Sequence, residues 1–97
     1  GAQMTQQYLI GELSVCLEQL QAAASQAAVR DVAHLRYEVE TRPVAGLVPA
    51  TARALALADA LCWDCVNQGD AAAFARLAGV AAQLRCFGVC ARLLPDH

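Results

Sequence analysis

Four of the five cysteines form two closely spaced pairs, and these pairs are the residues best placed to do chemistry. Cys62 and Cys65 are separated by two residues, Cys86 and Cys90 by three, and Cys16 stands apart. A Cys-x-x-Cys spacing is typical of zinc sites and of thiol oxidoreductases. Thiolates are also the soft ligands that Cu(I) prefers. The pairs therefore raise three kinds of chemistry: zinc binding, Cu(I) binding and thiol redox reactions.

A single metal ion held by both pairs is difficult to place within one chain. If a turn at Gly69 makes the flanking helices antiparallel, Cys65 lies near residue 73. Cys86 is then about 13 residues farther along, or about 20 Å at ~1.5 Å per residue, whereas zinc–sulfur bonds are only ~2.3 Å long. A four-cysteine zinc site would need a second subunit. We therefore predict no metal and no cofactor, and the alternative function is a Cu(I)-binding or thiol redox-sensing bundle that uses Cys62, Cys65, Cys86 and Cys90.

The Cys62–Cys65 pair fits a structural role better than a redox role. A reactive pair lies at a helix N-terminus, where the helix dipole stabilises the thiolate, but this pair lies near a helix C-terminus. Cysteine also packs as a small hydrophobic residue. We expect Cys62 and Cys65 to face the core with Leu55, Ala58 and Val66, opposite Arg53, Asp64, Asn67 and Gln68. Cys16, beside the Leu13–Leu20 stripe, is expected to be a core residue as well.

A second apolar strip on the last helix is the predicted interface. The core-facing residues of that helix are Ala73, Leu77, Val80, Leu84, Phe87, Ala91 and Leu94. Cys86 and Cys90 point away from them, on a surface shared with other small or apolar residues. Trp63, at the edge of the apolar face of its own helix, is either a core-boundary residue or an interface anchor. The interface candidates are therefore Trp63, Gly79, Ala82, Cys86, Cys90 and Leu93.

The first half of the chain predicts two helices. No Gly or Pro interrupts residues 12–41, but the apolar period changes phase near Ala24–Ser25, where Ser25 could be an N-cap. One long helix over residues 5–41 remains the alternative. The predicted fold is all-α: a small antiparallel four-helix bundle, or three helices if the N-terminal half is continuous.

The second half predicts a loop followed by a helical hairpin. Arg42–Pro49 is expected to be a loop, with Pro49 in the first turn of a helix that ends at about Asn67. Gln68-Gly69-Asp70 is expected to be a tight turn, with Gly69 in a left-handed conformation and Asp70 as the next N-cap. The last helix is expected to end at Pro95.

Composition and charge indicate a small domain with apolar surface. Residues 1–3 are typical of a purification-tag remnant, so the domain is taken as residues 4–95. No leader peptide is recognisable, and the protein is expected to be cytoplasmic. Charged residues are 16% of the chain, against roughly 25% in ordinary domains, so apolar surface should contact a partner and we predict a homodimer. The net charge of −2 provides no basis for binding nucleic acid or an anionic membrane. All seven cations are arginine, a bias associated with bacteria whose genomes are GC-rich.

One segment resembles a DNA-binding motif. Phe74–Leu84, "FARLAGVAAQL", resembles the "VARLAGVS" stretch of helix-turn-helix repressors, with Gly79 at the turn. The resemblance covers about ten residues and implies DNA binding. It departs from the motif at Arg85, where the motif has a core valine, and a continuous helix explains the apolar period better. A helix-turn-helix protein is therefore a lesser alternative.

A polar cluster on the second helix has two interpretations. Asp31, His34 and Glu38 share a helix face and could bind a metal ion or transfer protons. The favoured interpretation is a solvated face of ion pairs that also includes Arg42. No catalytic triad or phosphate-binding loop is recognisable, so we predict that the protein is not an enzyme. The predicted function is a protein-interaction or self-assembly module.

Overall fold

The chain folds into four helices, as the sequence predicts, and the computed structural model describes residues 6–23, 26–41 and 43–95. The helices are α1 (Gln6–Ala23), α2 (Gln26–Thr41), α3 (Pro43–Gln68) and α4 (Ala71–Cys90). The interruption between α1 and α2 confirms that the N-terminal half contains two helices. The predicted cap at Ser25 lies outside the described residues.

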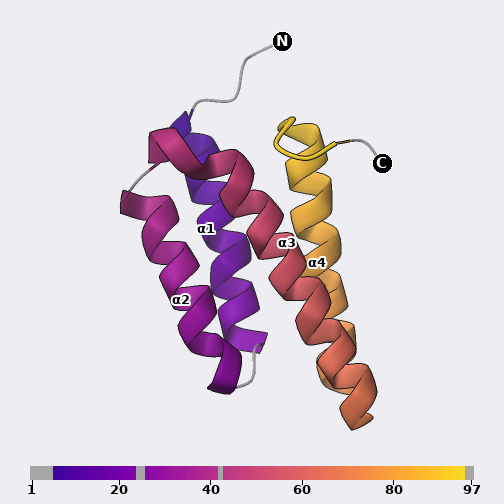
Figure 1. Cartoon of the computed structure of the whole chain (residues 1–97). Coiled ribbons are helices and arrows are strands. Elements are labelled where there is room, and N and C mark those ends of the chain that lie inside the picture. Colours follow the sequence, from indigo (N-terminus) through magenta and orange to yellow (C-terminus); the bar gives the residue numbers. More distant parts are fainter. Residues whose placement is uncertain (1–5, 24–25, 42, 96–97) are drawn as a thin grey trace.

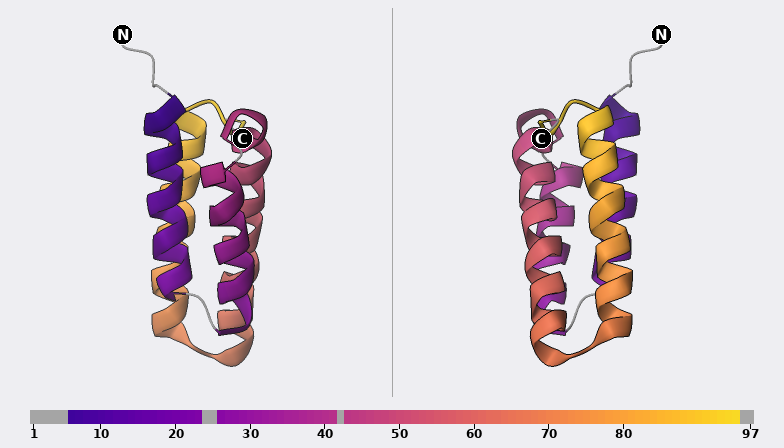
Figure 2. Two further views of the ribbon diagram at one scale, coloured as in Figure 1. Left: turned by 90° about the vertical axis from the view of Figure 1, so that its left-hand side faces the viewer. Right: turned by 90° about the vertical axis from the view of Figure 1, so that its right-hand side faces the viewer.

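The four helices form an antiparallel bundle with a central pair. Each helix runs opposite to the next one along the chain (Figures 1 and 2). α1 and α3 each contact all three other helices, whereas the described residues of α2 and α4 do not contact each other. α2 and α4 therefore lie on opposite sides of the α1–α3 pair. Figure 2 also shows that the α3–α4 hairpin projects beyond α1 and α2 at one end.

The core consists of the helix faces that the apolar periodicity predicts. Fully buried leucines of α1 and α4 form one cluster with small residues of α3. The largest of these side chains are Leu13, Leu17, Leu20, Leu77 and Leu84, and the buried alanines of α3 are Ala50, Ala54 and Ala58. Among the described residues Thr51 is the buried polar one, and its hydroxyl donates to the Leu47 carbonyl at 2.6 Å. Its burial therefore leaves no donor unsatisfied.

The turn between α3 and α4 confirms the sequence prediction. Gly69 has φ of 71°, a left-handed conformation that glycine adopts without steric cost. The next residue, Asp70, is the N-cap of α4, and its Oδ1 accepts a hydrogen bond from the Ala73 backbone N–H at 3.1 Å. Backbone hydrogen bonds from Gly69 to Val66 and from Asp70 to Cys65 close the turn. The two long helices are thereby held antiparallel.

The predicted loop before α3 is wrong. α3 begins at Pro43 rather than Pro49, which lies inside the helix. Pro43 takes the first-turn position in which a missing N–H costs nothing. Pro49 cannot donate to the carbonyl four residues earlier, so a bend is expected there, and in Figure 1 the first turns of α3 run at an angle to the rest. Packing compensates for the hydrogen bond that Pro49 cannot make, because Leu47 contacts the core and Ala50 is buried.

The predicted end of α4 at Pro95 is also wrong, because the helix ends at Cys90. The chain reverses at Arg92, which has φ of 60°. The Leu93 and Leu94 N–H groups both donate to the Gly88 carbonyl, at 2.7 and 3.0 Å. The Leu94 side chain lies so close to Gly88 that a Cβ there would be 2.4 Å from Leu94 Cδ1. The absence of a side chain at Gly88 therefore lets the C-terminal turn fold back onto the helix.

Candidate functional site

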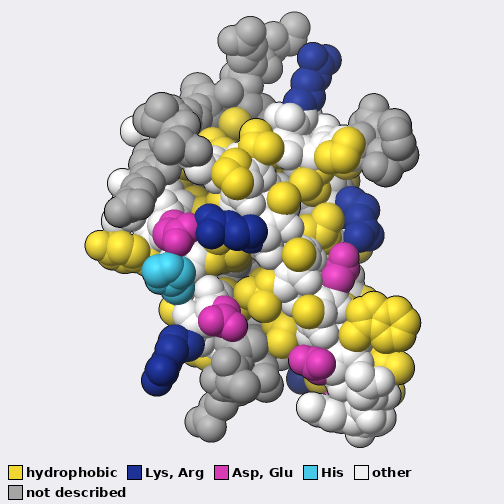
Figure 3. Space-filling model, viewed as in Figure 1, with side chains coloured by type: hydrophobic (Ala, Val, Ile, Leu, Met, Phe, Trp, Pro, Cys, Tyr) yellow, Lys and Arg dark blue, Asp and Glu magenta, His cyan; other side chains and the backbone are white. Residues whose placement is uncertain are grey.

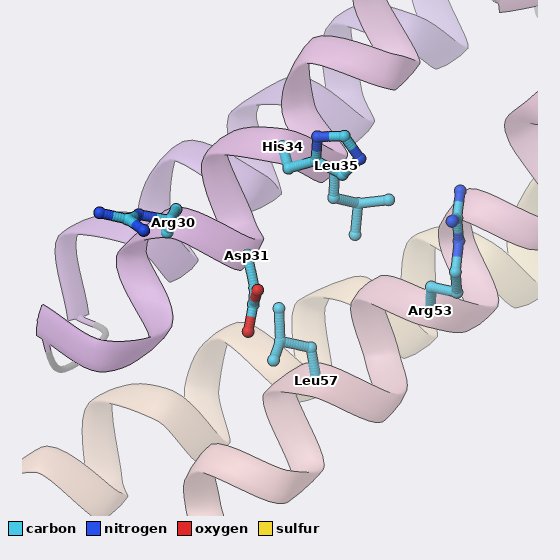
Figure 4. Close-up of a pocket in the computed structure, with 6 residues that line it drawn as sticks. All are labelled: Arg30, Asp31, His34, Leu35, Arg53 and Leu57. Atoms are coloured by element: carbon cyan, nitrogen blue, oxygen red, sulfur yellow. The ribbon is translucent and has the colours of Figure 1, made fainter.

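A groove of about 500 Å³ between α2 and α3 gathers polar side chains from both helices. Its lining residues are Arg30, Asp31, His34, Leu35, Arg53 and Leu57. Figure 4 shows that Asp31 points into the gap between the helices, toward Leu57, while the Arg30 guanidinium points away from it. The groove therefore combines an apolar wall with charges of both signs.

Glu38 organises the charges at one end of this groove. Its Oε1 lies 2.9 Å from His34 Nε2, and its Oε2 accepts a hydrogen bond of 2.5 Å from Arg53 Nη2. The Arg53 hydrogen bond, together with the charges of Arg53 and His34, holds the pKa of Glu38 below its ordinary value. Glu38 is therefore an ionised structural partner rather than a proton donor at neutral pH.

This geometry supports the ion-pair interpretation of the α2 polar face. His34 and Glu38 form an ion pair on that face, whereas Arg42, which the prediction spaced for ion pairs with Asp31 and Glu38, lies outside the described residues. No group of three or more His, Cys, Asp or Glu side chains within residues 6–23, 26–41 and 43–95 is placed to hold one metal ion. Asp31, His34 and Glu38 thus do not converge on a common centre.

The structure divides the five cysteines by burial. Cys16 and Cys65 are buried and Cys62 is half-buried against the core, whereas Cys86 and Cys90 are exposed. Burial is the main cause that raises the pKa of the Cys62 thiol, followed by Asp59 and Cys65. Burial, and then Glu12, raises the pKa of the Cys16 thiol. The prediction that Cys16, Cys62 and Cys65 pack as core residues is confirmed.

The outward face of α4 carries no charged side chain over its whole length. The exposed or half-buried residues on this face are Ala71, Ala72, Ala75, Ala78, Gly79, Ala82, Cys86, Val89 and Cys90. Arg76 and Arg85 lie only at its edges, by the 100° rotation per helical residue. Nothing lies within 4 Å of a Cβ built on Gly79. By length and composition alone α4 could also cross a membrane, a property that core helices share, and 33% of its apolar window is buried in the bundle.

Large hydrophobic side chains are exposed next to this face, at the projecting end of the α3–α4 hairpin. Trp63 is 68% exposed, Val66 50% and Phe74 39%, and Figure 3 shows large hydrophobic side chains at the right-hand edge of the molecule, just above the white tip of the hairpin. Val66 and Phe74 line one shallow pocket with Gly69, Asp70 and their neighbours. A lone exposed apolar residue is ordinary, but neighbouring large ones on adjacent helices are not.

We define the hairpin face as this patch together with the outward strip of α4: Trp63, Val66, Phe74, Ala75, Gly79, Ala82 and Cys86. The sequence placed Gly79, Ala82, Cys86 and Cys90 on an apolar strip and left Trp63 open between core boundary and interface anchor, and all five are exposed. It missed Phe74 and assigned Val66 to the core, which is wrong.

Two other predictions about α4 need correction. Leu93 does not extend the apolar strip, because it lies beyond the helix in the C-terminal turn. Gly79 does not form the turn of a helix-turn-helix motif, because α4 continues through it from Ala71 to Cys90. The continuous helix that the apolar period favours is confirmed.

No protein-family model, no curated protein and no solved structure matches the chain. The candidate sites for function are therefore the three features of the structure itself: the groove, the cysteines and the hairpin face.

Proposed function

We propose that this protein is a non-enzymatic interaction module that self-associates through the hairpin face. One observation carries the proposal: the outward side of a 20-residue helix has no charged residue, and three large apolar side chains lie exposed beside it. A surface helix normally carries charged and polar residues on the face opposite the core. The bundle covers only the inner side of α4.

The side chains of the strip favour a helix as the partner. Ala75, Gly79 and Ala82 are too small to bury much area in a lipid surface, where large apolar and aromatic residues insert. Small residues instead allow two helices to approach to the short end of the usual interaxial range of about 8–10 Å. A packed helix can therefore make many close contacts along this strip, which a membrane cannot.

A second copy of the chain is the partner that the charges fit. The ion pair nearest the face, Arg85 Nη2 with Asp59 Oδ2 at 3.6 Å, is already neutralised within one protomer. A second copy placed on the face consequently meets no uncompensated charge at its centre. Trp63 and Phe74 contribute to the area, because 68% and 39% of their surfaces are still exposed in one protomer, and a stable interface needs about 800 Å² per partner.

The test is the oligomeric state of two matched variants. Size-exclusion chromatography with light scattering should give a dimer for the unchanged protein. Ala82→Arg places a charge in the centre of the face and should weaken association by roughly 100-fold or more. Ala33→Arg makes the same change on an exposed position of α2, which does not contact α4 among the described residues, and should leave the dimer intact. A monomer in the unchanged protein at high micromolar concentration would refute the proposal.

A second candidate function, thiol-based binding of Cu(I), is favoured by one observation. Cys86 and Cys90 are both exposed and lie one helical turn apart, and two thiolates are enough for this soft cation. Competition with a chromophoric Cu(I) chelator under reducing conditions tests it. Cys86→Ser should abolish binding and Cys62→Ser should preserve it. No copper uptake by the unchanged protein would eliminate this candidate.

A further inference from the structure

We infer that the two copies pack hairpin face to hairpin face in an antiparallel arrangement, with the two-fold axis passing beside Gly79 and Ala82. This inference rests on the proposed self-association and specifies the partner surface. The observation behind it is that the exposed large residues and the small-residue strip belong to two adjacent helices. A partner that covers the large residues and the strip together must therefore contact both helices.

Val66 lies on the side of α3 that turns toward α4, and Trp63 lies about 60° farther around the helix, opposite the buried residues. The Asp59–Arg85 ion pair links the Val66 side of α3 to α4. Val66 also shares a surface pocket with Phe74 of α4. The strip and the aromatic patch therefore form one continuous face of the hairpin rather than two separate surfaces.

Symmetry then separates the two ways of pairing α4 with the partner's α4. In a parallel pair the two-fold axis runs along the helices, so the two α3 helices lie on opposite sides of the contact and Trp63 stays in solvent. In an antiparallel pair the axis is perpendicular to the helices, and α3 lies opposite the partner's α3. Only the antiparallel arrangement buries Trp63 and Phe74 together with the small residues, and so approaches the area of a stable interface.

The strip itself fixes the register of the antiparallel pair. Its members Ala75, Gly79, Ala82 and Cys86 are symmetric about the midpoint between Gly79 and Ala82. In this register Gly79 faces the partner's Ala82, and Ala75 faces the partner's Cys86. An interaxial distance of about 8–10 Å, less the helix radius of about 2.3 Å on each side, leaves facing Cα atoms roughly 3.4–5.4 Å apart. Disulfides need Cα atoms about 4.4–6.8 Å apart, so Ala75 and the partner's Cys86 are within reach of one.

Disulfide trapping tests this arrangement. With diamide as the oxidant, Ala75→Cys should give a covalent dimer on a non-reducing gel, and the double variant Ala75→Cys/Cys86→Ser should not. The unchanged protein should cross-link poorly through Cys86, because Cys86 and the partner's Cys86 are about 16 Å apart along the helices at about 1.5 Å per residue. Ala75 is exposed, so its replacement should not disturb the fold.

A second readout is the single tryptophan of the chain. Emission from Trp63 should shift to shorter wavelength as the protein concentration rises through the dissociation constant, and Trp63→Ala should weaken the dimer roughly tenfold or more. A dimer that cross-links in the unchanged protein through Cys86, or that keeps its cross-link in the double variant, is parallel and overturns this inference while leaving self-association intact. A dimer in which Trp63→Ala changes nothing also overturns it. A monomer refutes both proposals.

Discussion

Replacing Arg92 with glycine is expected to stabilise the protein. Among the described residues Arg92 is the non-glycine residue with positive φ, at 60°. Its N–H donates to the Val89 carbonyl at 3.0 Å, and the Leu93 N–H donates to the Gly88 carbonyl at 2.7 Å. This is the Schellman pattern, in which a residue in the left-handed conformation ends a right-handed helix. That conformation costs an L-residue roughly 1–2 kcal/mol, while glycine loses about 0.5–1 kcal/mol more conformational entropy on folding. The expected net gain in the free energy of unfolding is about 0.5–1 kcal/mol.

Two further variants separate the backbone effect from the loss of the arginine side chain. Arg92→Ala removes the guanidinium but keeps Cβ, so its stability should stay close to that of the unchanged protein. Gly69→Ala is the reciprocal change, because Gly69 has φ of 71° and nothing lies within 4 Å of a Cβ built there. It should cost about 1 kcal/mol or more, from backbone strain alone.

The assay is urea unfolding followed by circular dichroism, at one fixed protein concentration because self-association raises apparent stability by mass action. In thermal unfolding, an increase of 1 kcal/mol in the free energy of unfolding should raise Tm by about 4–8 °C for a chain of this length. If Arg92→Gly is no more stable than Arg92→Ala, the turn after α4 is not strained and the reasoning about that turn is wrong.

Three other predictions concern the core, the α2–α3 charges and the thiols. Leu84→Ala, at a fully buried position, should lower the free energy of unfolding by about 2–5 kcal/mol in urea titrations. Because Arg53 holds the pKa of Glu38 below its ordinary value of 4.5, the ionised Glu38 stabilises the fold above that pH, and this stabilisation is lost as the pH falls through the lowered pKa. In Glu38→Gln the free energy of unfolding should therefore fall less steeply as the pH drops below 4.5. The same pH dependence in the variant and the unchanged protein would contradict a stabilising role of ionised Glu38. At a protein concentration low enough to keep the protein monomeric, mass spectrometry should find exposed Cys86 alkylated by iodoacetamide well before buried Cys16, and equal rates would contradict the burial.

The helices and their inner faces could be predicted from the sequence because burial follows a period of 3.6 residues. Leu13 and Leu20 of α1 and Leu77 and Leu84 of α4 are buried as that period requires. The turn at Gly69 could be predicted because its chemistry is local. Glycine supplies the left-handed backbone and the following aspartate supplies the cap, whatever the helices pack against.

The ends of α3 and α4 could not be predicted in this way, because tertiary contacts decide them. Pro49 has the local signature of a helix start, yet contacts of Leu47 and Ala50 with the core extend the helix back to Pro43. Pro95 has the signature of a helix stop, yet the chain leaves the helix earlier because Leu94 packs onto Gly88. In both cases a proline marks a possible boundary, and packing selects a different one.

The exposure of the projecting end of the α3–α4 hairpin (Figure 2) has a cause that no local pattern contains, namely unequal helix lengths. α3 has 26 residues and α1 has 18, or about 39 and 27 Å at about 1.5 Å per residue. The end of α1 at Ala23 lines a small pocket with Cys65 and Ala73, among others. Val66 lies at about that level, but it turns away from Ala23 and is 50% exposed. The prediction that Val66 faces the core was right about its chemistry and wrong about its surroundings, and a second hairpin is what would supply the missing surface.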